Sequence, residues 1–278
     1  MEVVTFGESM VLFSGDQELP LEYVHQFHKQ MAGAESYVAI GLARLGHSAG
    51  WFSKLGQDAF GRYILQSIRG QGVDTSRCTY TDAAPTAVFF KERRSGGKTQ
   101  VYYYRQGSAA SLMTKEDLDE SYLAQAKILH VTGITPALSE SCFELTIHAM
   151  DAAKRNQVSI VFDPNIRWKL WDRDTAKSRL LELAARADYI LPGLDEGEFL
   201  TGRPRPKDIA EFFLKFGSKA VIVKLGKDGA YYQSFTERGH VPAIPVREID
   251  PVGAIVVGVK GDTEGLPDEE ELQGMMSG

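Results

Sequence analysis

A chain of 278 residues is long enough to form one large α/β domain around a single core. Its 43% hydrophobic and 24% charged residues are ordinary for a globular enzyme, and no apolar run approaches the roughly 20 residues that span a bilayer. The formal net charge of −6 argues against a broad phosphate-binding surface. We therefore expect neither nucleic acid nor a membrane as a partner.

The cysteines and the first residues indicate the compartment. Cys78 and Cys142 lie far apart and outside any C-x-x-C arrangement, so neither a disulfide framework nor a thiolate zinc site is predicted. The opening MEVVTFGES lacks the basic stretch followed by an apolar one that begins an export signal. We expect a cytoplasmic protein.

The first third of the chain alternates between strand and helix patterns. Residues 2–6 predict a buried strand, and apolar residues at helical spacing predict a helix from Ala34 to Leu45 with Gly46 as its C-cap. A strand over 49–56 and a helix over 58–72 follow, and then a turn leads into another strand. This alternation indicates βαβ units and a parallel sheet.

Two segments, 11–30 and 85–107, break this alternation. In the second segment, TAVFFKER and TQVYYYRQ flank SGG, which predicts a hairpin. Antiparallel ribbon inserted between α/β units usually forms a lid or an edge. We therefore predict that both segments join in a small β lid.

The alternation resumes after residue 111. Strand patterns occur at 127–132, SIVFDPN, YILPG, AVIVKLG and AYYQS, and helix patterns occur at 139–155, DTAKSRLLELAARA and DIAEFFLKFG. We expect one α/β domain over residues 1–278.

Several polar groups stand where a ligand would be held. Gly33 precedes a helix, where backbone N–H groups are free, although a turn glycine is usually structural. Tyr103 and Arg105 share one face of a strand and suit a carboxylate, the alternative being an aromatic ladder that steadies the ribbon. Arg167 follows D-P-N at the carboxyl end of a strand, where ligands gather in open α/β sheets, but it also fits an ordinary surface arginine.

A second set of residues suits a nucleotide. Lys224, Gly226 and Gly229 lie in a strand, glycine turn and strand, which is favoured as a simple hairpin and is also compatible with ATP. It is not a Walker A loop. Gly96-Gly97-Lys98-Thr99 is not one either, because Glu92 stands at the required first glycine.

The last motif is Asp250-Pro251-Val252-Gly253-Ala254. A helix beginning here would present the N–H groups of Gly253 and Ala254 as an anion hole for a phosphoryl group. A strand pattern begins at Ile255 instead, and four residues cannot connect two parallel strands. A segment is therefore missing or rerouted between Ala254 and Ile255.

In this order, the motifs resemble the ribokinase-type (PfkB-type) carbohydrate kinases over almost the whole chain. Gly33-Ala34-Glu35, GLARLG, YYR-x-GSA, GITPALS, DPNIR and GDTEGLP resemble the 2-keto-3-deoxygluconate kinase branch in particular. The resemblance implies a ribokinase-like doubly wound, mostly parallel sheet with helices on both faces and a small β lid. It also implies ATP-dependent phosphorylation of a sugar acid, 2-keto-3-deoxygluconate to its 6-phosphate, with Mg²⁺.

The resemblance also implies residue roles. The acceptor sugar would be bound by Gly33, Phe89, Tyr103, Arg105, Ile134 and Arg167. ATP would lie beside Lys224, Gly226 and Gly229, and Glu196 would be associated with Mg²⁺. The chain departs from the family at Ala32, where the family has glycine, and at Tyr37 and Gly193, where it has asparagine.

The largest departure is in the family's D-x-x-G-A-G-D motif, which stops here after Ala254. The aspartate that serves the family as base is absent, together with roughly two helices, and we hypothesise that the intact protein contains this segment. Two alternatives remain open: another PfkB-type kinase, similar to ribokinase or fructokinase, or a catalytically dead sugar-acid-binding relative if the chain is complete. We also expect a homodimer through the β lid, because unpaired strand edges need covering.

Overall fold

The computed structural model describes residues 1–94 and 98–244 of the chain. These residues form two compact units. Unit 1 holds residues 1–5 and 114–244, and unit 2 holds residues 6–94 and 98–113. The predicted Gly253 and Ala254, and the expected break after Ala254, lie outside the described residues.

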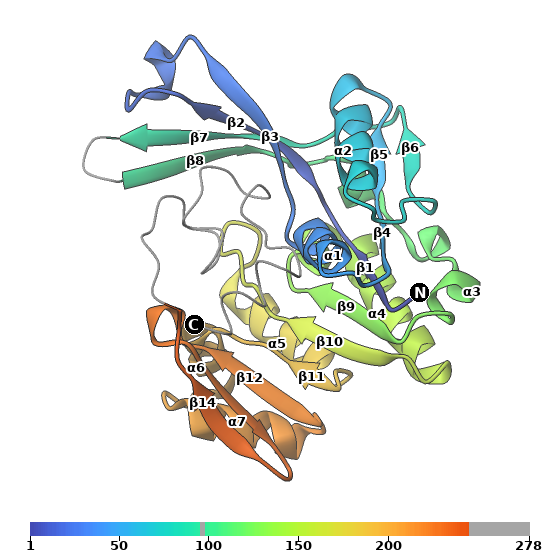
Figure 1. The fold of residues 1–278 in the computed structure, drawn as a ribbon, viewed down its shortest axis with the longest axis vertical. Helices are drawn as coiled ribbons and strands as arrows, with labels where there is room; N and C mark the ends of the chain where they lie inside the picture. The colour runs from blue at the N-terminus through green and yellow to red at the C-terminus, as the bar shows by residue number, and fades with distance from the viewer. Residues whose placement is uncertain (95–97, 245–278) are drawn as a thin grey trace. The chain divides into compact units, whose positions relative to one another are not determined.

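Unit 1 is built on a mostly parallel sheet (Figure 1). Its strands are hydrogen-bonded in the order β14-β13-β12-β11-β10-β9-β1. The pairs between β1 and β12 are parallel, whereas β13 and β14 are added antiparallel at one edge. The strands are β1 (Val3–Phe6), β9 (Ile128–Thr132), β10 (Ser159–Asp163), β11 (Tyr189–Ile190), β12 (Ala220–Lys224), β13 (Ala230–Ser234) and β14 (Arg238–Val241).

The core of unit 1 follows from these short apolar strands. Ile160 and Phe162 of β10 and Val221 and Val223 of β12 are completely buried. Alternation of buried and partly buried residues along these strands places their large side chains on one face. The parallel sheet predicted from the sequence is therefore confirmed.

The helices of unit 1 are α3 (Glu120–Leu123), α4 (Glu140–Arg155), α5 (Arg173–Ala184), α6 (Leu194–Thr201) and α7 (Pro206–Phe216). Side-chain caps mark where α4 and α5 begin: Ser139 Oγ accepts from the Cys142 N–H at 3.1 Å, and Asp172 Oδ1 from the Thr175 N–H at 3.0 Å. The sequence pattern did not predict α6, because it has only eight residues and buries little besides Leu200.

Unit 2 contains the predicted β lid as a four-stranded sheet in the order β3-β2-β7-β8 (Figure 1). The two predicted segments meet where β2 and β7 pair in parallel, and antiparallel pairs lie on either side. The hairpin predicted over 85–107 is confirmed in its described residues. The strands of this lid sheet are β2 (Met10–Gly15), β3 (Phe27–Ala32), β7 (Val88–Arg94) and β8 (Lys98–Tyr104).

The rest of unit 2 consists of short elements around a second core. The helices are α1 (Ala34–Arg44) and α2 (Ala59–Gly70), and the remaining strands are β4 (Ala49–Phe52), β5 (Lys54–Gly56) and β6 (Thr79–Thr81). Trp51, Ile64 and Ile68 are almost fully buried in this core. The single strand predicted over 49–56 was wrong: the strand is interrupted at Ser53, and β5 pairs with β6 instead.

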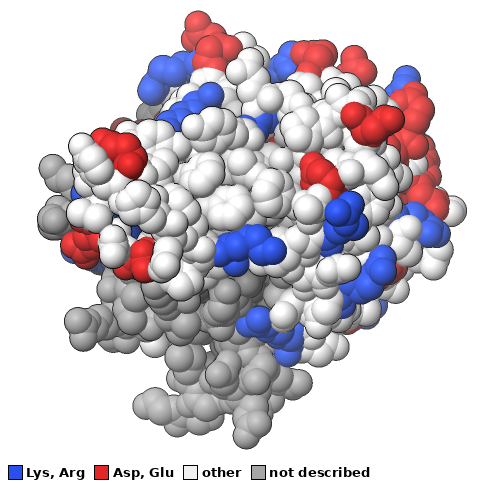
Figure 2. Space-filling model, turned by 90° about the horizontal axis from the view of Figure 1, so that it is seen from above, with Lys and Arg blue, Asp and Glu red and all other residues white. Residues whose placement is uncertain are grey.

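The face shown in Figure 2 has Lys, Arg, Asp and Glu interspersed around a broad uncharged area, without a continuous basic field. Unit 2 also exposes large aromatic side chains, with Tyr23 62% and Tyr104 64% accessible. Within the described ranges, no helix is both long and apolar enough to span a membrane.

Candidate functional site

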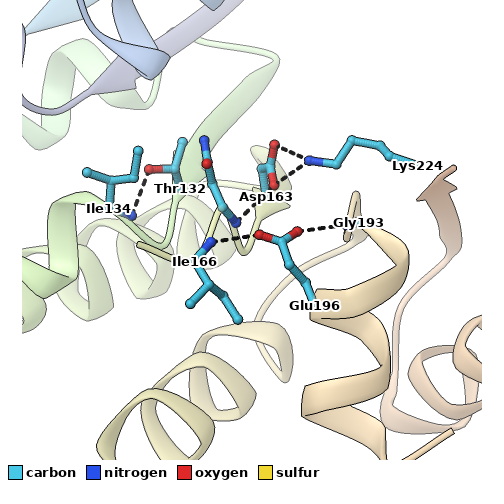
Figure 3. A network of polar contacts seen from close by, with 8 residues as sticks. Thr132, Ile134, Asp163, Ile166, Gly193, Glu196 and Lys224 are labelled. Carbon is cyan, nitrogen blue, oxygen red and sulfur yellow. Dashed lines mark hydrogen bonds and ion pairs between the residues drawn. The ribbon is translucent and has the colours of Figure 1, made fainter. Parts of the chain in front are cut away.

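Polar groups of unit 1 gather where its parallel strands end (Figure 3). The strands β9, β10 and β12 finish at Thr132, Asp163 and Lys224, and α6 begins just after β11. In open α/β sheets this carboxyl edge is where ligands bind. The residues predicted there, which the fold brings to this edge or to the turn that follows it, are Ile134, Arg167, Glu196, Lys224, Gly226 and Gly229.

An ion pair joins the ends of two of these strands. Lys224 Nζ lies 2.8 Å and 2.7 Å from the two carboxylate oxygens of Asp163, across the end of β11. Asp163 Oδ1 also accepts from the Asn165 N–H at 3.1 Å, and Asn165 has a φ of 37°. The carboxylate therefore ties Lys224 and stabilises a left-handed turn directly before Arg167.

Glu196 holds the other side of the same loop. Its Oε1 accepts from the Ile166 N–H and its Oε2 from the Gly193 N–H, both at 2.7 Å. The second bond caps the start of α6, and the first fastens the loop after β10 to that helix. Arg167, the next residue, is exposed, and among the described residues it has no ion-pair partner. Glu196 thus braces the backbone that carries this arginine.

Ile134 lies on a loop pressed against the loop after β10. A Cβ added to Gly133 would stand 2.0 Å from the Pro164 carbonyl oxygen, so only glycine permits this backbone approach. The Ile134 N–H donates to Thr132 Oγ1 at 3.0 Å, and the Trp171 indole N–H donates to the Gly133 carbonyl at 3.0 Å. Ile134 is therefore held rigidly, with 7% of its surface exposed.

Gly226 and Gly229, the two glycines of the predicted nucleotide turn, differ in what surrounds them. Gly226 and Gly229 both have positive φ, at 58° and 90°. A Cβ on Gly229 would meet the Val241 carbonyl oxygen at 2.0 Å, whereas no described atom lies within 4 Å of a Cβ on Gly226. Packing explains Gly229, while Gly226 leaves an uncovered stretch of backbone beside Lys224.

His130, which the sequence analysis did not single out, lies inside this unit. Its Nδ1 is 3.0 Å from Thr5 Oγ1 on the neighbouring strand. Burial, together with the charge of Lys224, lowers the pKa of His130 to about 4. The imidazole is therefore neutral near pH 7. Its signal in the sequence was a lone histidine within the apolar strand pattern KILHVT.

Unit 2 brings together three of the predicted acceptor residues. The rings of Phe89 and Tyr103 are stacked with centroids 5.4 Å apart, and the Arg105 guanidinium lies 5.6 Å from the Tyr103 ring. Tyr103 and Arg105 are two residues apart at the end of β8, so the predicted shared face is observed. Tyr103 therefore takes part both in the aromatic ladder with Phe89 and in the predicted carboxylate clamp with Arg105.

Arg105 is not an open cation. Its Nη2 lies 2.6 Å from Glu8 Oε2, and the two side chains are 9% and 1% exposed. Ser108 Oγ donates to the other oxygen, Glu8 Oε1, at 2.5 Å. Burial raises the pKa of the Glu8 carboxyl, while the Arg105 charge and the Ser108 hydroxyl act in the opposite direction. Glu8 was not predicted from the sequence, where its signal was an acidic residue two positions after a buried strand.

Gly33 lies against the same group of residues. A Cβ there would stand 2.5 Å from Ser9 Oγ, 2.6 Å from Ser36 Oγ and 2.9 Å from the Glu8 carbonyl oxygen. Close approach therefore requires glycine at the start of α1. Tyr37, which replaces the family's asparagine, is accommodated because its hydroxyl donates to the Met31 carbonyl at 2.9 Å and its ring packs beside the lid sheet.

A mostly parallel α/β sheet with polar groups at its strand ends, together with a β lid, matches the architecture expected for a ribokinase-like sugar kinase. A family model described as pfkB family carbohydrate kinase matches residues 1–254. The chain belongs to this family. The match ends at Ala254, the residue after which the sequence departs from the family pattern.

The chain is also similar to individual members of this family. The chain is 43% identical to 2-dehydro-3-deoxygluconokinase of Bacillus subtilis over an alignment of 280 positions that covers 98% of this chain and 86% of that one. It is 32% identical to Fructokinase-1 of Oryza sativa, with 98% and 87% covered. Ribokinase II of E. coli, solved with ATP and Mg²⁺, has the same fold with a TM-score of 0.92, at 24% identity and 99% coverage of both chains.

Proposed function

We propose that this protein transfers the γ-phosphoryl group of ATP to 2-keto-3-deoxygluconate, giving the 6-phosphate. The observation that carries the proposal is Arg167: an exposed guanidinium without an ion pair among the described residues, on a loop fixed by Glu196 and Asp163. An available cation on a fixed loop suits an acceptor that has a carboxylate, whereas fructose and ribose have no carboxylate with which to form an ion pair. The 43% identity to the Bacillus subtilis sugar-acid kinase supports the same choice.

The residue roles follow the sequence-based assignment. Lys224 and the open backbone at Gly226 are assigned to ATP, together with Gly229. Gly253 and Ala254 are assigned to the anion hole. The acceptor is assigned to Gly33, Phe89, Tyr103, Arg105, Ile134 and Arg167.

The carboxylate of Glu196 fits Mg²⁺ held through water. Both oxygens already accept a backbone N–H, yet each retains a lone pair, and Mg²⁺ usually keeps several waters and binds substrate phosphates. Among the described residues no group of three potential metal ligands occurs, which agrees with a metal that arrives with ATP. When bound, ATP with Mg²⁺ supplies the transferable phosphoryl group.

The test is a comparison of acceptors. Phosphorylation of 2-keto-3-deoxygluconate, fructose and ribose would be measured with ATP and Mg²⁺, for the wild type and for Arg167→Gln. We expect turnover of the sugar acid, lowered about 10- to 100-fold in kcat/KM by the substitution, as for the loss of a charged hydrogen bond. Faster turnover of fructose would instead favour a fructokinase.

A catalytically dead relative is the second candidate, favoured by Ile255 standing where the family has the glycine before its aspartate. Loss of a positioned base typically removes roughly 10²- to 10⁴-fold in rate. Intact mass separates the two candidates, because a protein that contains the missing segment is heavier than the 30.7 kDa of this sequence. A protein of 30.7 kDa that binds the sugar acid without turnover would be the dead relative.

Two further predictions accompany the proposal. The homodimer through the lid sheet is supported by exposed aromatic side chains such as Tyr23 and Tyr104, and sedimentation of the wild type would test it. The cytoplasmic location stays a prediction from the N-terminal sequence and the two cysteines.

A further inference from the structure

The ion pair with Glu8 distinguishes Arg105 from Arg167, the other arginine assigned to the acceptor sugar. Arg167 is exposed and has no ion pair among the described residues. Arg105 is more than nine-tenths buried and already has an anionic partner 2.6 Å away. A second carboxylate on Arg105 would lie beside Glu8 and be repelled by it.

The Arg105 guanidinium has one N–H group, at Nε, that is not used in the ion pair with Glu8. Arg105 Nε is buried, and within the described part of the chain it has no hydrogen-bond partner. Folded proteins almost always satisfy such a group, because a buried donor without an acceptor is unfavourable. Arg105 also lies beside Tyr103, a predicted acceptor-binding residue that is 39% exposed.

Glu8 is itself firmly placed. Ser108 Oγ donates to Oε1 at 2.5 Å, while the Glu8 carbonyl lies against Gly33 at the start of α1. The carboxylate therefore has a fixed position from which to hold Arg105. Glu8 Oε2, which lies 2.6 Å from Arg105 Nη2, both places the guanidinium and offsets its positive charge.

We propose that Glu8 is a positioning residue for the acceptor: it fixes Arg105 through Nη2, so that Nε donates to an uncharged oxygen of the sugar acid, a carbonyl or a hydroxyl. This inference rests on the proposed function, since it assigns one uncharged oxygen of the sugar acid to Arg105.

The test is the dissociation constant of 2-keto-3-deoxygluconate, measured by titration calorimetry on the full chain for the wild type, Glu8→Gln and Glu8→Asp. Binding does not require turnover, so the measurement is valid for an active or a dead protein. We expect Glu8→Gln to weaken binding about 10- to 100-fold, as for a charge-assisted hydrogen bond that loses its alignment. Glu8→Asp, which keeps the charge, should recover part of the loss.

A role of Arg105 in binding the carboxylate predicts a different effect of Glu8→Gln on sugar-acid affinity. If Arg105 bound the carboxylate, removing the charge of Glu8 would leave binding unchanged or make it tighter, and either result overturns the proposal. If the wild type does not bind the sugar acid at all, the proposed function itself fails, which is a different outcome.

Glu92→Gln is the matched control. Glu92 is also buried in unit 2 and paired with an arginine, Arg94. It accepts hydrogen bonds from the Tyr102 hydroxyl and the Leu21 N–H, and neither of these residues is assigned to the sugar. We expect its effect on sugar-acid affinity to be less than about threefold, the scale of a single weak contact. An equal loss in both variants would mean that Glu8 only stabilises unit 2.

Ser108→Ala keeps the test open if Glu8→Gln fails to fold. It removes one hydroxyl from Glu8 Oε1 and leaves the ion pair in place. We expect binding to weaken about three- to tenfold, the scale of one neutral hydrogen bond. Unchanged binding in a folded Ser108→Ala, together with an unfolded Glu8→Gln, would contradict the positioning role.

Discussion

Each unit of the molecule has an ion pair among its candidate site residues, and the two pairs differ in exposure. In unit 2, Arg105 and Glu8 are 9% and 1% exposed. In unit 1, Lys224 and Asp163 are 43% and 20% exposed, at a similar distance of 2.7 Å. Water can replace either partner in the second pair but not in the first.

The difference shows why a charged residue at a predicted site must be read together with its partner. An exposed pair costs little to open, so its cation remains available to a phosphate. A buried pair is expensive to separate, because either charge alone would be left in a medium of low polarity. Lys224 therefore stays accessible to water and to anions, whereas Arg105 is held by Glu8.

The largest effect is expected for Arg105→Met. This change leaves the Glu8 carboxylate buried without its counter-charge, and we expect a loss of about 3–5 kcal/mol in the free energy of unfolding. Urea unfolding of the purified variant measures it. The double variant Glu8→Gln with Arg105→Met removes both charges and should recover much of the loss; a double variant as unstable as the single one would show that the charge is not the cause.

Gly133→Ala tests the backbone packing of unit 1 and is expected to come next in size. The new Cβ would lie 2.0 Å from the Pro164 carbonyl oxygen and 2.7 Å from Leu180 Cδ2, so the loop after β10 must move. We expect a loss of about 3 kcal/mol, the upper range for overpacking, and weaker sugar-acid binding because Arg167 follows that loop. Gly72→Ala is a poor control because of its positive φ, whereas Gly70→Ala meets no described atom within 4 Å and should be close to neutral.

His130 makes the stability of the protein depend on pH. Its pKa is lowered to about 4 in the folded protein, from about 6.5 when unfolded, so the unfolded chain binds more protons between these values. Its contribution to stability is complete above pH 6.5 and is lost as the pH falls toward 4. We expect about 2 kcal/mol less stability at pH 5 than at pH 7.

Urea unfolding at the two pH values, repeated on His130→Asn, isolates this effect. Asparagine keeps a polar atom near Thr5 Oγ1 but does not titrate, so the variant should lose the part of the pH dependence that His130 causes. Identical pH profiles for the two proteins would contradict the buried neutral histidine.

Much of the fold could be predicted because it depends on local patterns. The parallel strands, the hairpin over 85–107 and the shared face of Tyr103 and Arg105 all follow from alternation and turn residues. Helix α6 was missed because eight residues give too short a pattern. The interruption at Ser53 was missed because no glycine, proline or asparagine stands between Trp51 and Leu55 to mark a turn.

The partners of the site residues could not be predicted in the same way. Glu8 and Ser108 are separated by 100 positions, and Asp163 and Lys224 by 61, so no local pattern relates them. The resemblance to a family supplied the residues assigned to the ligands but not the side chains that hold those residues. Those depend on packing between distant segments, which only the folded structure shows.

The smallest effect on stability is expected for Lys224→Met in the exposed pair. Asp163 keeps its hydrogen bond from the Asn165 N–H and remains in contact with water, so we expect a change of about 0.2–1 kcal/mol in the free energy of unfolding. ATP affinity should fall about 10- to 100-fold, since a phosphate loses a charged donor, and Lys224→Arg should retain part of it. Urea unfolding and calorimetric titration with ATP measure the two effects on the same sample. A loss of 3 kcal/mol or more with unchanged ATP affinity would place this pair in the same class as Glu8 and Arg105, because exposure would then have failed to separate a structural pair from a ligand-binding one.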